Sequence, residues 1–105
     1  MLKLTALEQD ALVRGVATER TRLKAGRIIW DELEAKLPPV TGDPEKDADR
    51  LYAFKKMAGL RSFNEKRALK EWLEAQINAD YPDVLDNDSE LSNAIEMYKE
   101  YVKVL

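Results

Sequence analysis

A series of mostly apolar positions recurs at alternating intervals of four and three residues over the first third of the chain. The eight positions, called the seam below, are Leu12, Val16, Glu19, Leu23, Gly26, Trp30, Leu33 and Leu37. An average spacing of 3.5 residues places all of them on one narrow face of a helix, where they can pack against another helix. The pattern therefore predicts that this face docks on a partner surface, either within the chain or on a second molecule.

The seam predicts one long helix over residues 5–37. Thr5 and Glu8 have the spacing of a capping box, and two prolines directly after residue 37 end the pattern because proline lacks the amide hydrogen. A helix of this length would extend about 50 Å at 1.5 Å per residue. Gly15 and Gly26 each cost about 1 kcal/mol relative to alanine inside a helix. If the helix is not continuous, we expect a bend near Gly26 that divides it into two shorter pieces.

Three shorter helices are predicted after it. The first starts at Pro44 behind an Asp43 cap and ends before Gly59. The second starts with a capping box over residues 62–65 and ends at Pro82, and the third starts at Asp88 or the next residue and continues to residue 105. No segment alternates apolar and polar residues as a half-buried strand does. The predicted fold class is all-α: one domain over residues 1–105, a small bundle of about four helices whose first is long, either continuous or bent.

Composition excludes most catalytic chemistry. The chain contains neither cysteine nor histidine, so it has no thiolate nucleophile, no imidazole base and none of the commonest zinc ligands. Its four glycines are too dispersed for a phosphate-binding loop. Residues 86–90 carry oxygen side chains as a calcium loop does, but Leu91 and Met97 occupy the positions where such a loop needs glycine and glutamate. We therefore expect no enzymatic activity, no cofactor and no metal site.

No apolar run approaches the roughly 18 residues of a transmembrane helix, and the first residues do not follow the pattern of a signal peptide. We therefore expect no membrane partner and a cytoplasmic location.

Charge is divided unevenly along the chain. Residues 50–70 hold seven basic and one acidic residue, whereas residues 71–105 hold two basic and nine acidic residues. The two segments could compensate each other inside the fold. Alternatively, the acidic segment could face a basic protein, or the basic segment could bind nucleic acid as a helix-turn-helix. In this last interpretation the contacting residues would be Arg61, Asn64, Lys66, Arg67 and Lys70.

The interpretation that we favour is a non-catalytic adaptor, regulator or inhibitor that recognises another protein. Self-association ranks first among its partners, because three later helices cannot obviously cover so long a seam. Nucleic-acid binding is the less favoured alternative, since an isoelectric point near 5.1 opposes unspecific affinity for nucleic acid. The residues predicted to form the protein interface are Leu12, Val16, Leu23, Trp30, Leu33 and Tyr101.

Overall fold

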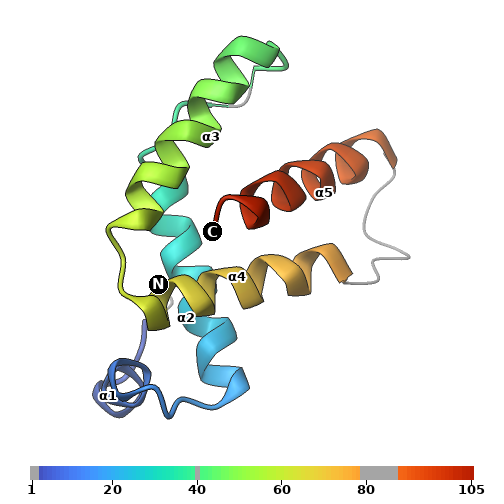
Figure 1. Ribbon diagram of the computed structural model, residues 1–105. Coiled ribbons are helices and arrows are strands. Elements are labelled where there is room, and N and C mark those ends of the chain that lie inside the picture. The colour runs from blue at the N-terminus through green and yellow to red at the C-terminus, as the bar shows by residue number, and fades with distance from the viewer. Residues whose placement is uncertain (1–2, 40, 79–87) are drawn as a thin grey trace.

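The computed structural model describes residues 3–39, 41–78 and 88–105, with side chains in the last range described from residue 95 onward. These parts of the chain form helices and no strand (Figure 1). The helices are α1 (Ala6–Arg14), α2 (Glu19–Glu34), α3 (Pro44–Gly59), α4 (Phe63–Asn78) and α5 (Asp88–Lys103). The prediction of an all-α fold is confirmed.

The prediction of one long first helix is wrong, because α1 ends at Arg14 and a separate helix, α2, begins at Glu19. Gly15 has a φ of 75°, in the left-handed region, and donates its backbone N–H to carbonyls of the last turn of α1. A glycine in this conformation commonly terminates an α-helix. Thr18 then caps α2 by accepting the N–H of Thr21 at 3.2 Å. The seam is therefore divided between two helices, and the chain changes direction between them (Figure 1).

Gly26 is a packing contact inside α2, and the helix is not interrupted there. A Cβ atom at this position would lie 2.2 Å from the Ala68 carbonyl oxygen and 2.6 Å from Trp72 Cβ, both on α4. Only a residue without a side chain allows the two helices to approach this closely. The predicted bend is therefore replaced by a close crossing of α2 and α4.

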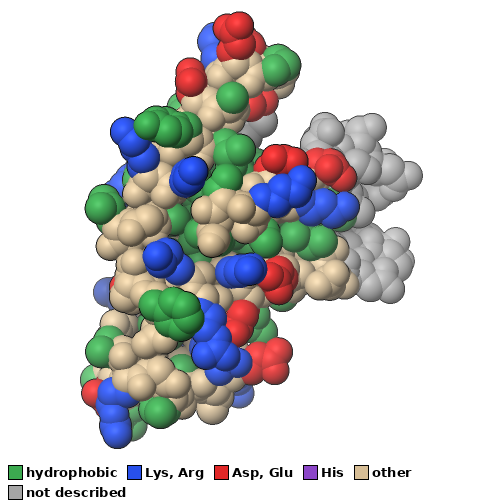
Figure 2. All heavy atoms as spheres, in the orientation of Figure 1, with side chains coloured by type: hydrophobic (Ala, Val, Ile, Leu, Met, Phe, Trp, Pro, Cys, Tyr) green, Lys and Arg blue, Asp and Glu red, His purple; other side chains and the backbone are tan. Residues whose placement is uncertain are grey.

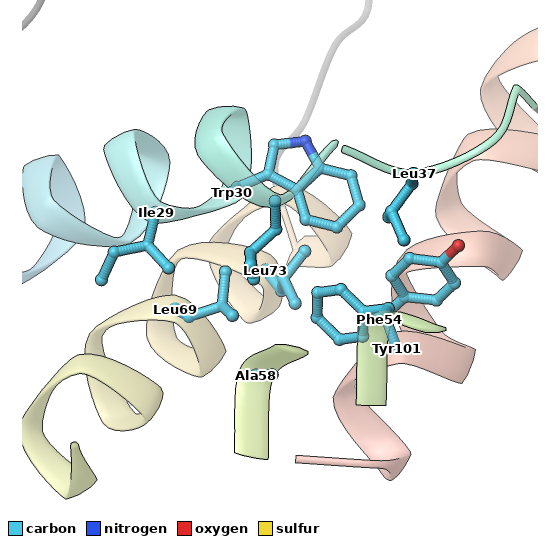
Figure 3. Packing of buried hydrophobic residues seen from close by; sticks show 9 residues of the cluster. Ile29, Trp30, Leu37, Phe54, Ala58, Leu69, Leu73 and Tyr101 are labelled. Atoms are coloured by element: carbon cyan, nitrogen blue, oxygen red, sulfur yellow. The ribbon is translucent and has the colours of Figure 1, made fainter. Parts of the chain in front are cut away.

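Trp30 lies at the centre of the core, on α2. Its ring centroid lies 5.8 Å from that of Phe54 on α3 and 5.5 Å from that of Tyr101 on α5. Leu69 and Leu73 of α4 are fully buried beside it (Figure 3). Four helices thus converge on one indole ring, and the largest part of the seam is covered by this chain itself.

α1 packs on a second, smaller cluster. Leu12 is buried there with Ala17, Ala25 and Ala68. Lys24 of α2 donates a hydrogen bond of 2.9 Å to the Glu8 carboxylate of α1. The capping box that the sequence predicts at residues 5–8 is present, and the hydrogen bonds from the Thr5 backbone and Lys24 hold the pKa of Glu8 below its usual value.

Candidate functional site

A groove of about 780 Å³ lies between the first half of α3 and the second half of α5. The two helices diverge there, so the groove is open along one side (Figure 1). It is lined by Gly42, Pro44, Asp47, Ala48, Arg50, Leu51, Glu96, Met97, Glu100 and Tyr101. A concave surface of this size is the usual form of a binding site.

Apolar side chains form the floor of the groove. Ala48 and Leu51 are one turn apart on α3, and Met97 faces them from α5. Leu51 and Met97 also pack on the core, whereas Ala48 is exposed.

Arg50 forms the wall of the groove and is almost completely buried, at 3% exposure. Its Nε donates to the Pro38 carbonyl at 2.8 Å, and its Nη1 donates to the Tyr101 hydroxyl. The same guanidinium lies 3.7 Å from the Glu34 carboxylate. One side chain therefore fastens α3 to the end of α2, to the following loop and to α5, and so fixes the width of the groove.

Burial raises the pKa of the Tyr101 hydroxyl above its ordinary value, although the nearby Arg50 cation opposes this shift. A neutral hydroxyl can accept from Arg50 and costs less to bury than a phenolate. The sequence places Arg50 in the basic segment 50–70, whose position inside or outside the fold the pattern leaves open. Nothing in the local pattern distinguishes it from its neighbours, because its partners lie 12 and 51 residues away.

Carboxylates form the rim. Asp47 accepts hydrogen bonds from Thr41, at 3.1 Å from the backbone N–H. Glu96 and Glu100 accept from lysines on the outer side of α5 at 3.4 and 3.3 Å. Exposed ion pairs of this kind contribute only about 0–1 kcal/mol and exchange readily. With three carboxylates and one guanidinium among its residues, the lining of the groove carries a net negative charge.

The residues predicted as a protein interface separate into two groups. Leu12, Trp30, Leu33 and Tyr101 are buried within this chain, at 3% exposure or less. Tyr101 also lines the groove. Val16 is 65% exposed after α1, and Leu23 is half-buried on α2.

The residues predicted to bind nucleic acid are mostly engaged within the chain. Arg61 contacts Glu32 at 2.7 Å and Glu65 at 3.0 Å. The paired Arg61 and the Ser62 hydroxyl hold the pKa of Glu65 below its ordinary value, although partial burial acts in the opposite direction.

Arg67 pairs with Glu71 at 3.1 Å, and the Asn64 amide donates to the Val13 carbonyl at 3.2 Å. Lys66 and Lys70 have no carboxylate partner in the part of the chain that the structure describes. Of the five residues predicted to bind nucleic acid, two are thus cations without a carboxylate partner in the described part of the chain.

Within the described ranges, no group of three acidic side chains is arranged to hold a metal ion. The calcium-like residues 86–90 lie outside the described residues, apart from the backbone at the start of α5. No helix among the described residues combines the length and apolarity needed to cross a membrane.

Comparison with protein-family models, with curated proteins and with solved structures finds no significant match. The function must therefore be argued from the geometry of this chain.

Proposed function

We propose that the protein is a non-catalytic recognition module, and that its groove between α3 and α5 receives the apolar side of a cationic amphipathic helix from a partner protein. The observation that carries this proposal is the combination of an apolar floor and an acidic rim in one concave surface. A helix-in-groove complex uses these two components: buried apolar anchors supply affinity, and the charges beside them select the partner.

The floor favours a helical ligand. Ala48, Leu51 and Met97 present an apolar surface between two diverging helices. A third helix can place residues i, i+3, i+4 and i+7 into such a groove while its polar face remains in water. The partner therefore needs a short stripe of large apolar residues.

The rim specifies the charge of that ligand. Asp47 lies on one side of the groove, and Glu96 and Glu100 lie on the other. Lysine or arginine beside the apolar stripe would meet a carboxylate from either side, whereas a glutamate there would be repelled. Rim charges act mainly on partner choice and on association rate.

The walls of the groove are formed before the ligand arrives. Arg50 and Tyr101 hold α3 and α5 together through a buried hydrogen bond, and Trp30 packs behind them. Binding to a surface that is already ordered avoids part of the conformational cost of association. A helix that needs no reshaping of the protein is the ligand that this site fits best.

The test uses a fluorescent synthetic peptide of about 15 residues, with leucines on one face of a helix and lysines on the other. Anisotropy should show saturable binding, and a peptide with glutamates in place of the lysines should bind at least tenfold more weakly. The Ala48→Arg variant should lose binding because it fills the floor with a long cation. Ala6→Arg is the matched control, since it makes the same change at an exposed position on α1.

Equal binding by wild type, Ala48→Arg and Ala6→Arg would reject the groove as the site. Binding of duplex DNA that weakens steeply with salt, and that Lys66→Glu with Lys70→Glu abolishes, would favour the nucleic-acid function instead.

A further inference from the structure

A second exposed surface lies where α3 turns into α4. Its apolar members are Leu60, at 89% exposure, and Phe63, at 75%. Three lysines adjoin them in helical register: Lys56 four residues before Leu60, and Lys66 and Lys70 three and seven residues after Phe63. We call these five residues the basic corner. Figure 2 shows hydrophobic side chains interspersed with Lys and Arg over α3 and the beginning of α4.

The basic corner has no ion pair within the described part of the chain. Among the described residues, none of its three lysines has a carboxylate partner, and Lys56 instead lies 4.8 Å from the centre of the exposed Tyr52 ring. Two large apolar side chains at the tip of a turn gain nothing from folding, since they remain in water. Such a protruding apolar pair surrounded by cations is typical of an interaction surface.

The basic corner has the chemistry that the groove requires. It presents large apolar groups with lysines beside them, and the groove presents an apolar floor with carboxylates beside it. Both surfaces include residues of α3: residues between 44 and 51 line the groove, and the basic corner begins at residue 56. A rigid helix that rises 1.5 Å per residue holds them apart, so a corner cannot reach the groove of its own chain.

We infer that the groove of one copy receives the basic corner of a second copy. This inference rests on the proposed function of the groove and names its partner. Because the two surfaces differ, the contact is heterologous, and a bound pair still offers one free groove on one copy and one free corner on the other. Association therefore rises with protein concentration, and it weakens at high salt because lysines and carboxylates approach each other at the rim.

The experiment measures molar mass by sedimentation over a range of protein concentrations at low salt. Wild type should exceed the 12.0 kDa of one chain as concentration rises. Two variants should remain monomeric: Leu60→Glu with Phe63→Glu, which removes the corner, and Ala48→Arg, which blocks the groove. All three changes lie at exposed positions, so each variant should retain the helical content of wild type.

An equal mixture of the two monomeric variants gives the sharpest result. The corner variant keeps an intact groove and the groove variant keeps an intact corner, so the mixture should form a complex of two chains that grows no further. A mixture that stays monomeric, or a wild type that is monomeric at every concentration, would overturn the inference.

The same samples separate this inference from the function on which it rests. If wild type stays monomeric but its groove binds the lysine-bearing peptide, only the second copy is rejected as the partner. If the peptide also fails to bind, both proposals fall. If labelled single-stranded DNA binds to wild type and not to the corner variant, the basic corner binds nucleic acid, and its assignment to the groove of a second copy is rejected.

Discussion

Replacing Gly26 by alanine should destabilise the protein strongly, although alanine favours helices more than glycine does. The added methyl group would lie 2.2 Å from the Ala68 carbonyl oxygen and 2.6 Å from Trp72 Cβ. Both atoms belong to the backbone or lie next to it, so neither can move without displacing α4. The two helices would have to separate by about 1 Å to restore ordinary contact distances of about 3.5 Å.

The magnitude follows from two opposing terms. Alanine gains about 1 kcal/mol of helix propensity over glycine. Overpacking of a close interface costs about 1–3 kcal/mol and more when backbone must shift. This contact lies against the backbone and next to the Trp72 and Trp30 pair, so the cost should lie at the upper end of that range. After the gain in helix propensity is subtracted, we expect the free energy of unfolding to fall by about 2 kcal/mol. In a domain of this size that loss lowers the melting temperature by about 10 °C.

The assay is urea and thermal unfolding followed by far-ultraviolet circular dichroism. Gly59→Ala is the matched control, because Gly59 is also helical, has no positive φ and has open space around its Cβ position. This control should be as stable as wild type or slightly more stable. A Gly26→Ala variant that unfolds at the same urea concentration as wild type would refute the close crossing of α2 and α4.

Three further predictions concern buried or paired groups. Arg50→Ala should lower the free energy of unfolding by about 3 kcal/mol in urea titrations, because the buried Tyr101 hydroxyl and the partly buried Pro38 carbonyl lose their donor. Arg50→Lys should recover little of this loss, because one ammonium group cannot reproduce the several directed N–H groups of the guanidinium. Glu65 has a lowered pKa in the folded state, so its contribution to stability is present above its ordinary value of 4.5 and is lost as pH falls through the folded pKa. Glu65→Gln should therefore flatten the dependence of the urea midpoint on pH below pH 4.5. An unchanged slope would contradict the pairing of Glu65 with Arg61. The pKa of Tyr101 is raised, so absorbance titration should show one tyrosine that ionises above the ordinary value of 10.0. Stability should fall as pH rises through the raised pKa of this folded-state hydroxyl. Tyr101→Phe should remove this ionisation from the absorbance titration.

Local signals predicted the helical fold well. The caps at Thr5, Asp43 and Ser62 are confirmed, because each depends on a side chain and an amide two or three residues apart. The seam misled for a physical reason. A period of 3.5 residues also arises when two successive helices each direct one face at the interior, here at two separate clusters, so the pattern continues across the helix end at Gly15.

The groove could not be predicted in the same way. It depends on where α3 and α5 diverge and on Arg50 reaching Pro38 and Tyr101, and these contacts join residues distant in sequence. Composition indicated an acidic segment and a basic one, but local pattern did not show which members stay exposed. Arg61 and Arg67 are paired within the chain, whereas Lys66 has no carboxylate partner among the described residues.

Two-dimensional amide NMR of the labelled protein, titrated with the lysine-bearing peptide, tests recognition through the groove most directly. The shifts should concentrate on groove-lining residues such as Ala48, Leu51 and Met97, and α1 should stay unchanged. Shifts confined to α1, or no shifts at saturating peptide, would contradict recognition through the groove.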